Sequence, residues 1–254
     1  MVYSFDSGDF DVEYVESEIK KPIIWESHCH SQFEMIAVTE GDISVVLEGK
    51  KYRLKEKQML IIPPLHYHTV TANGNGIYRR VTVLFDFSAI PAVLRAEFEK
   101  CDSGMQRTDS QTALRLRELF LKGNTDFYAP LMRSIMIEIF YEALERRERH
   151  IEIEADGFLE KALEYIDKHL FEKIALDDLA RYTARSKSSF CHLFFEKMNI
   201  SPKQYIIQKK LALAEKLIDG GMPRTEAAMR VGYSNYSDFY RAYKKMRNSR
   251  RESN

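Results

Sequence analysis

The 254-residue sequence predicts an α+β protein in three parts: a β-rich N-terminal barrel (residues 1–90), a helical segment (91–150) and an all-helical C-terminal domain (157–254). Three observations support this division. From Ile23 to about Phe87, short runs of β-branched and aromatic residues alternate with Gly, Asn, Asp and Pro. From Pro91 the apolar residues recur every three or four positions, which is the helical period. The last part contains the same helix-turn-helix plan twice.

Turn-forming residues divide the N-terminal part into short strands. Gly, Asn and Asp tolerate the positive φ of hairpin turns, and Pro cannot join a central strand. Several short strands with turns at this spacing predict a small barrel or sandwich. The predicted strands are Phe33–Val38, Ile43–Leu47, Met59–Ile62 and Tyr78–Phe87, and the turns are Glu40-Gly41-Asp42, Glu48-Gly49-Lys50, Pro63-Pro64 and Asn73-Gly74-Asn75-Gly76.

A group of candidate ligand-binding residues lies in this part. His28, His30 and Glu34 are separated by even numbers of residues, so on an extended strand all three face one side. His68 follows a little later, after Pro63. Three imidazoles and one carboxylate suit Zn, Fe, Mn or Cu. The residues alone leave three alternatives open: a bound divalent metal, a metal-free pocket for a small molecule, and a structural role.

Two helices are expected in the middle segment, over residues 113–120 and from about residue 130 to residue 149. The apolar stripe of the second helix packs either into the chain's own core or against a second copy of the chain. The polar stretch Glu148–Asp156 is the expected linker to the last domain. The stripe consists of Leu131, Ile135, Met136, Ile139, Phe140 and Leu144.

Two helix-turn-helix units are expected between Ile174 and Met246. In each unit a small residue is followed four positions later by another, because helices that cross at a tight turn leave no room for larger side chains. A helix from Pro202 to Ile218 joins the units. Its length of about 25 Å, at about 1.5 Å per residue, lets the second helices enter successive major grooves about 34 Å apart. The small residues and the apolar residue that follows them are Ala180, Ala184 and Phe190, and Ala228, Gly232 and Phe239.

These residues and their spacing resemble the DNA-binding domain of AraC/XylS-type transcription regulators. The motif His28-x-His30-x-x-x-Glu34, with the later His68, is similar to the motifs of cupin barrels, in which such residues gather around a metal. Cupin barrels attached to AraC-type domains resemble sensors more than enzymes, and the helices that follow them pair two protomers. The C-terminal resemblance rests on Ala180, Ser186, Phe190, Leu193, Phe194, Tyr205, Lys210, Leu211, Ala214, Leu217, Ile218, Ala228, Val231, Gly232, Tyr233, Ser237, Phe239, Arg241, Tyr243, Lys244 and Lys245.

The chain departs from these family patterns at several positions. Lys57 and Leu65 stand where the second cupin motif usually has glycine. Asn199 and Asn248 stand where the DNA-binding domain usually has glycine, and asparagine can adopt the left-handed conformation. Lys210 replaces an arginine. The sequence also stops without the usual Pro-x-x-Tyr-Arg ending, so we expect the last helix of the family pattern to be absent.

The second helix of each unit is the expected DNA reader, because an α-helix fits the major groove. Ser186 and Ser234 precede these helices and are good N-caps. Arg241 is the strongest candidate for a base contact, since its guanidinium can pair with guanine O6 and N7. Lys244, Lys245, Arg247, Arg250 and Arg251 are expected to attract phosphates. With Phe190, Leu193, Phe194, Phe239, Ala242 and Tyr243 facing the core, the candidate DNA-binding residues are Lys187, Ser188, Ser189, Cys191, His192, Tyr236, Asp238, Tyr240, Arg241, Lys244 and Lys245.

Charge is distributed unevenly although the formal net charge is zero. Residues 157–254 contain 19 Lys and Arg against 12 Asp and Glu, whereas residues 1–156 contain 19 against 26. A basic half joined to an acidic half suits a regulator that binds nucleic acid. No apolar run reaches the length of about 18 residues that a membrane span needs, the N-terminus lacks a signal-peptide pattern, and Cys29, Cys101 and Cys191 form no Cys-x-x-Cys pair. These features predict a cytoplasmic protein.

We therefore expect a sequence-specific regulator that binds double-stranded DNA as a homodimer, and not an enzyme. We expect it to respond to a small-molecule effector, such as a sugar or another metabolite, and to activate transcription through RNA polymerase. The effector is expected at His28, His30, Glu34 and His68, where no cofactor is required although a divalent metal would fit. The alternative is a metal-dependent cupin enzyme whose C-terminal domain no longer binds DNA. The reader helices and the basic charge of that domain argue against it.

Overall fold

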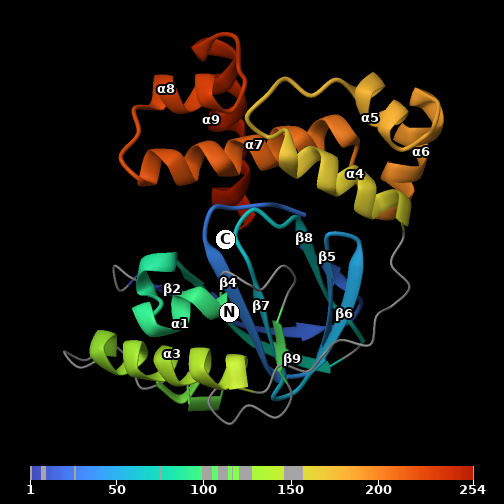
Figure 1. Ribbon diagram of the computed structural model, residues 1–254. Coiled ribbons are helices and arrows are strands. Elements are labelled where there is room, and N and C mark those ends of the chain that lie inside the picture. The colour runs from blue at the N-terminus through green and yellow to red at the C-terminus, as the bar shows by residue number, and fades with distance from the viewer. Residues whose placement is uncertain are drawn as a thin grey trace.

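The computed structural model describes residues 2–6, 10–25, 27–74, 76–98, 105–107, 114–115, 117–119, 128–145 and 157–253. Its N-terminal part consists of two antiparallel sheets that face each other, which confirms the predicted barrel (Figure 1). One sheet has the strand order β1-β2-β9-β4-β7-β10 and the other the order β3-β8-β5-β6. The strands are β1 (Val2–Asp6), β2 (Phe10–Ile19), β3 (Ile23–Ile24), β4 (Phe33–Glu40), β5 (Asp42–Leu47), β6 (Lys50–Lys55), β7 (Met59–Ile62), β8 (His68–Ala72), β9 (Gly76–Phe85) and β10 (Met105–Arg107).

Strand β4 is buried on both of its faces. Ile36 and Val38 belong to the core between the two sheets. Met35 and Ala37 point the other way, into a second core on the outer face of the six-stranded sheet. A strand covered on both sides is continuously apolar, which explains the unbroken run in the sequence.

Several elements of the barrel do not follow from the sequence pattern. Strands β1 and β2 lie before Ile23, where the predicted β-rich stretch begins. Strand β10 lies in the segment that was expected to be helical. Its three residues form a strand because they pair with β7, a contact that their composition does not reveal. Phe87, expected at the end of the last strand, begins a short 3-10 helix (Phe87–Ala89) instead.

The helix α3 (Tyr128–Glu145) covers the outer face of the six-stranded sheet, after the shorter α1 (Ala92–Phe98). Ile135 and Ile139 of α3 are buried in the outer core, whereas Leu131 is exposed. Of the two alternatives for the apolar stripe, the structure shows that these buried residues pack into the chain's own core. Of the helix expected over residues 113–120, the described residues 114–115 and 117–119 are helical. The expected linker Glu148–Asp156 lies outside the described residues.

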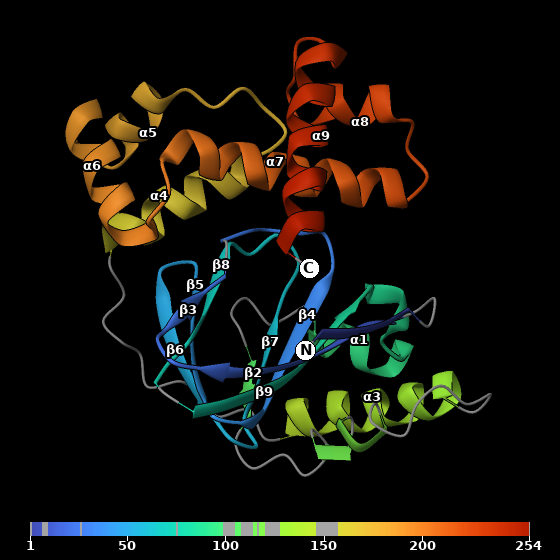
Figure 2. The same cartoon turned by 180° about the vertical axis from the view of Figure 1, so that it is seen from behind.

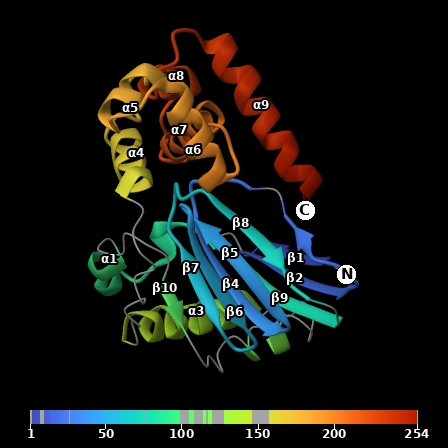
Figure 3. The ribbon, with the colours of Figure 1, turned by 90° about the vertical axis from the view of Figure 1, so that its right-hand side faces the viewer.

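The C-terminal domain contains the two predicted helix-turn-helix units, and it lies across one end of the barrel (Figure 3). The first unit is α5–α6 and the second is α8–α9, and they lie near opposite ends of α7 (Figures 1 and 2). In the described part of the chain, no helix is both long and apolar enough to cross a membrane. The helices are α4 (Gly157–Lys168), α5 (Leu176–Tyr182), α6 (Lys187–Met198), α7 (Pro202–Asp219), α8 (Arg224–Arg230) and α9 (Tyr236–Ser253).

The turns of the two units share one backbone conformation. Ala184 has φ +54° and Gly232 has φ +82°, so both residues are left-handed. A Cβ on Gly232 would lie 2.9 Å from the carbonyl oxygen of Glu172 and 2.9 Å from Nζ of Lys210. Lys210 is buried there and donates hydrogen bonds to the carbonyl oxygens of Glu172 and Val231, the latter at 2.6 Å. The lysine that replaces the family arginine thus joins the start of one unit to the turn of the other.

The predicted helix caps are partly confirmed. Ser186 caps α6 by accepting a hydrogen bond from the backbone N–H of Ser189 at 3.3 Å. Helix α9 is capped by Asn235 and not by Ser234, because the Asn235 side chain accepts from the backbone N–H of Asp238 at 2.9 Å. Asn199 takes the left-handed conformation expected of it. By contrast, Asn248 lies inside α9 and does not end a helix.

Candidate functional site

The four predicted ligand residues meet at the end of the barrel that faces the C-terminal domain. Their candidate ligand atoms all lie within 4.8 Å of one another. Glu34 is on β4 and His68 begins β8, but His28 and His30 lie before β4, so the three do not share one strand as predicted. The cluster forms because His28 pairs with His68 as an isolated antiparallel bridge. The structure therefore brings the four predicted residues together, but not on the single strand that the sequence predicts for three of them.

Two of the imidazoles direct the same ring nitrogen at Glu34. Nδ1 of His30 lies 2.8 Å from the carbonyl oxygen of Gln32, and Nδ1 of His68 lies 2.9 Å from that of His66. Carbonyl oxygens only accept, so both Nδ1 atoms carry the hydrogen. In neutral rings each Nε2 then presents a lone pair to Oε2 of Glu34, at 3.1 Å and 2.8 Å. Two lone pairs facing a carboxylate repel it unless a proton or a cation lies between them.

Burial and charge act in opposite directions in this cluster. Burial disfavours ionisation of Glu34, but the facing His68 and His30 outweigh it and hold the pKa of the carboxyl well below its usual range. Burial also disfavours a charged His68, yet the Glu34 carboxylate raises the pKa of that imidazole. Nε2 of His68 has no aligned hydrogen-bond partner in the described part of the chain, although it lies 2.8 Å from Glu34. The site therefore favours positive charge at its centre.

This arrangement fits a divalent transition metal such as Zn²⁺. Metal-bound imidazoles usually donate their other N–H to a carbonyl or carboxylate oxygen, and His30 and His68 do so. Bonds of about 2.0–2.2 Å place ligand atoms up to about 4.4 Å apart, so these four need to move little. His28, His30, Glu34 and His68 would hold the ion, which would supply the positive charge that the geometry calls for.

Further polar side chains inside the barrel escape the sequence analysis. Tyr78, Arg80 and Thr82 alternate along β9 and point into the space between the sheets, where all three are buried. The Arg80 guanidinium lies 4.4 Å above the ring of Trp25 and 3.5 Å from the carboxylate of Glu13. Burial raises the pKa of Tyr78 to about 12. Their occurrence at every second position of β9 could have indicated that they share one face of the strand. The other residues of β9 are mostly apolar, however, so the run resembles an ordinary buried strand.

The first reader helix, α6, exposes only part of the predicted set. Lys187, Ser188 and His192 are exposed, whereas Ser189 and Cys191 are half-buried and Cys191 packs against the domain core. The ammonium of Lys187 lies 3.0 Å from Asp177. The predicted inward residues Phe190 and Phe194 are fully buried, and Leu193 is half-buried. Phe195, which the sequence analysis passed over, is exposed beside them.

The second reader helix, α9, exposes every candidate predicted on it. Arg241 pairs with Asp238, and Asp238 also accepts a hydrogen bond from the side chain of Asn235 at 2.7 Å. Asp238 therefore orders the start of the helix as well as holding Arg241. The side chains of Arg250 and Arg251 lie outside the described residues. The exposed candidates are Tyr236, Asp238, Tyr240, Arg241, Lys244 and Lys245.

Comparison with known families agrees with both halves of this geometry. Residues 11–139 match the AraC-like ligand binding domain, and residues 179–250 match a helix-turn-helix domain. The chain belongs to the AraC family of transcription regulators. As an AraC-type regulator it combines a ligand-binding barrel with a DNA-binding domain, as the sequence resemblance implied.

Individual proteins are similar to this AraC-type regulator over different shares of the chain. The probable transcriptional regulator LumQ of Photobacterium leiognathi is 35% identical over 83 residues, which are 32% of this chain and only 34% of LumQ. The uncharacterized HTH-type transcriptional regulator YdiP of Escherichia coli is 23% identical over 86% of this chain and 78% of its own. The crystal structure of ToxT from Vibrio cholerae is 12% identical, covers 93% of both chains and has a TM-score of 0.45.

Proposed function

We propose that this AraC-type regulator acts in the cytoplasm as a homodimer that binds specific sequences in double-stranded DNA. It activates transcription through contact with RNA polymerase when a small-molecule effector, such as a sugar or another metabolite, occupies the barrel. The effector site is His28, His30, Glu34 and His68, and a divalent metal held by these residues is part of it. The observation that carries the proposal is the position of this four-residue site, at the end of the barrel that faces the DNA-binding domain.

The DNA-binding half of the proposal rests on the two exposed reader helices. Helix α7 has 18 residues and separates them, which at about 1.5 Å per residue amounts to about 27 Å. Successive major grooves lie about 34 Å apart, so one protomer can place a reader in each. The excess of basic residues in the domain supplies a sequence-independent attraction to phosphates.

The homodimer is proposed to use a face of α3 different from the buried stripe. Ile137 and Tyr141 are exposed apolar residues on this helix, with exposed fractions of 42% and 55%. They are four residues apart, so they share one side of the helix, which is turned away from the side of Ile135 and Ile139. Pairing through this face would fix the spacing of the operator half-sites.

The experiment uses the full chain and a library of genomic DNA fragments. The wild type should select particular fragments, and its affinity should fall steeply as the salt concentration rises, because bound phosphates release counterions. Failure to retain any fragment at low salt would contradict the regulator function. Metal analysis and mass spectrometry of the purified protein, native and denatured, would identify the metal and effector that it carries.

The His30→Ala variant separates the sensor from the enzyme alternative. We expect it to lose the response to the effector and to keep DNA binding, because His30 lies in the barrel and not on a reader helix. A metal held by four protein ligands has no open position for a substrate unless its coordination expands. Turnover of a small molecule by the wild type that is lost in His30→Ala would favour the cupin enzyme instead.

A further inference from the structure

Glu48 connects the barrel to the helix that joins the two reader units. It lies in the turn between β5 and β6, and its carboxylate accepts hydrogen bonds from three groups. The backbone N–H of Tyr67 donates to Oε1 at 2.8 Å. The hydroxyl of Tyr205 donates to Oε2 at 2.6 Å, and Nζ of Lys209 donates to Oε1 at 3.3 Å. Tyr205 and Lys209 are both on α7, so one barrel carboxylate holds the spacer between the readers.

This contact is buried, not a surface ion pair. Tyr205 is fully buried and the exposed fraction of Lys209 is 3%. Lys209 also lies 2.7 Å from Asp167 of α4, and these two acids outweigh burial and raise the pKa of its ammonium. Polar groups with so little access to water lose much more when a partner is removed than exposed groups do.

Packing around Glu48 is equally close. The rings of Tyr67 and Tyr205 meet edge to face, with centroids 5.5 Å apart. Next to Glu48, Gly49 passes so close to α4 that a Cβ on it would collide with the side chain of Leu159. Tyr67 and Cys29 of the barrel belong to the same apolar cluster as the core of the C-terminal domain.

The same backbone segment leads from Glu48 to the four-residue site. The backbone N–H of Glu48 donates to the carbonyl oxygen of Tyr67 at 2.9 Å, so the two residues hold each other in both directions. Tyr67 directly precedes His68, whose backbone exchanges two hydrogen bonds with His28, at 2.9 Å and 3.0 Å. A ligand that fixes the His28 and His68 rings therefore also restrains the backbone N–H of Tyr67, which donates a hydrogen bond to Glu48.

We propose that Glu48 couples the barrel site to the DNA-binding domain. When a metal fixes His28 and His68, the bonds from Glu48 to Tyr205 and Lys209 become more persistent, and α7 is held more firmly against the barrel. Occupancy of the site thereby controls how freely α7 and the readers attached to it can move. This inference rests on the proposed binding of a metal at that site. Glu48 acts as a positioning residue and does not touch the metal.

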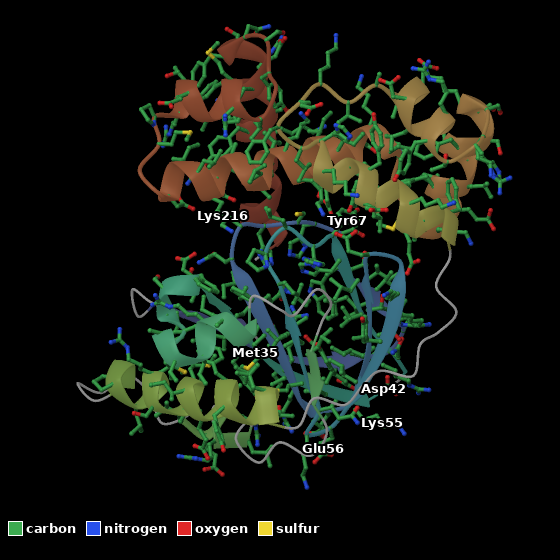
Figure 4. All side chains as sticks on the ribbon, in the orientation of Figure 1. Met35, Asp42, Lys55, Glu56, Tyr67 and Lys216 are labelled. Carbon is green, nitrogen blue, oxygen red and sulfur yellow. The ribbon has the colours of Figure 1, made fainter. Side chains whose placement is uncertain are left out.

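Hydrogen exchange of the full-length protein tests the coupling, with Zn²⁺ as the probe. The variants are Glu48→Ala and the milder Tyr205→Phe, which keeps the ring and removes only the hydroxyl. Glu56→Ala is the matched control, since Glu56 lies at the opposite end of the barrel from Tyr67 (Figure 4). Zinc binding is measured by calorimetry on each protein, and the amides of β9 serve as an internal reference for global stability.

Without zinc, the amides of α7 should exchange hydrogen about tenfold faster in Glu48→Ala than in the wild type, because a buried charged hydrogen bond is lost. Tyr205→Phe should shift them in the same direction, and Glu56→Ala should not. With zinc, α7 should become more protected in the wild type and in Glu56→Ala. Glu48→Ala should still bind zinc, more weakly than the wild type only by the factor that reciprocal coupling requires, and yet show no added protection of α7.

Each other outcome contradicts a different part of the proposal. If the amides of α7 exchange equally fast in zinc-free Glu48→Ala and zinc-free wild type, Glu48 does not hold α7 against the barrel. Equal protection of α7 by zinc in Glu48→Ala and the wild type would show that coupling does not pass through Glu48. If the wild type binds no zinc, the metal site fails, and the coupling proposed from it fails too. The zinc-free comparison then still decides whether Glu48 holds α7, and Tyr205→Phe carries that comparison if Glu48→Ala does not fold.

Discussion

At the scale of single residues, two departures from the cupin pattern have a structural explanation. Lys57 and Leu65 stand where the family usually has glycine, and both have φ +65°. The chain thus keeps the left-handed turns of the barrel without the residue that adopts them freely. A left-handed conformation costs a residue with a Cβ about 1–2 kcal/mol. These turns are therefore strained in this protein.

Replacing Lys57 by glycine should stabilise the protein. The strain that glycine releases exceeds the free-energy cost of the extra entropy that it gives the unfolded chain. The net increase in the free energy of unfolding is about 0.5–1 kcal/mol. Urea denaturation should show this increase in the free energy of unfolding. Lys55→Gly is the control, because Lys55 lies in strand β6, and it should be destabilising. A loss of stability in Lys57→Gly would contradict the assignment of strain.

Gly232 offers a second residue-scale test, since both its backbone and its surroundings exclude a side chain. Gly232→Ala should destabilise the protein by about 1–3 kcal/mol and weaken DNA binding, because a Cβ meets the carbonyl of Glu172 and the ammonium of Lys210. Gly221→Ala is the matched control, for Gly221 has φ +93° with nothing within 4 Å of the added Cβ. Equal losses of unfolding free energy in the two variants would show that the close contacts at Gly232 do not matter.

Arg241 remains the strongest candidate for reading a base. Its ion pair with Asp238 is exposed on both sides, so giving it up to reach DNA costs little. Arg241→Ala should cost about 1–3 kcal/mol of binding and relax the preference at one base position. Lys245→Ala is the comparison. It should weaken binding to all DNA sequences alike and reduce the magnitude of the slope of log affinity against log salt concentration by about one. Selection of fragments from random DNA by both variants measures this, and an unchanged consensus in Arg241→Ala would exclude the contact.

At the scale of elements, α3 illustrates where sequence periodicity stops being sufficient. The stripe of Ile135 and Ile139 correctly predicted a helix with one apolar face. It did not say what covers that face, and the answer is the chain's own six-stranded sheet. Ile137 and Tyr141 are exposed, although in the sequence each stands next to a residue of the buried stripe, so the sequence alone did not separate them from it.

The exposed face of α3 gives a prediction for assembly. Ile137→Glu should convert the proposed homodimer to a monomer, because a charge would be buried without a partner at the interface. Val93→Glu is the control: Val93 has an exposed fraction of 83% and lies on α1. Sedimentation of both variants and the wild type at micromolar concentration measures this. A wild type that is monomeric with and without DNA would contradict dimerisation altogether.

The strands show a similar division between what the sequence could and could not predict. The strand prediction succeeded for β4, β5 and β7, which are apolar runs bounded by clear turn residues. It failed for β2, whose alternating acidic residues resemble a surface segment until β9 pairs with it along ten residues. The helix-turn-helix units were predictable because the small residues of their turns, and the apolar residue that follows each turn, are local features.

At the scale of the whole molecule, the docking of the two domains could not be predicted from the sequence. Glu48 was recognised only as part of a turn, yet its partners Tyr205 and Lys209 lie 157 and 161 residues away. No local pattern connects positions at that separation. The four-residue site was predictable for the opposite reason, because its motif depends on residue type and short spacing. How that site communicates with the DNA readers is therefore information that only the fold contains.

The pH dependence of metal binding also belongs to this scale. Protons and a metal compete for the imidazole nitrogens, so zinc affinity should fall as the pH decreases. Glu34 outweighs burial and raises the pKa of His68, so protonation begins above the ordinary value of about 6.5. Calorimetric titration of Zn²⁺ between pH 8 and pH 5.5 should show this loss of affinity as the pH decreases. An affinity that stays constant across this range would exclude imidazole ligands.

The most direct test of the central claim, that the barrel site controls DNA reading, is the dissociation constant for a selected DNA fragment with and without Zn²⁺. In the wild type, zinc should change this constant by a factor within the range of about 5–150 that is typical of coupled sites. In His68→Ala the constant without zinc should equal that of the wild type, and zinc should no longer change it. The same zinc effect in both proteins, or none in the wild type, would contradict the claim.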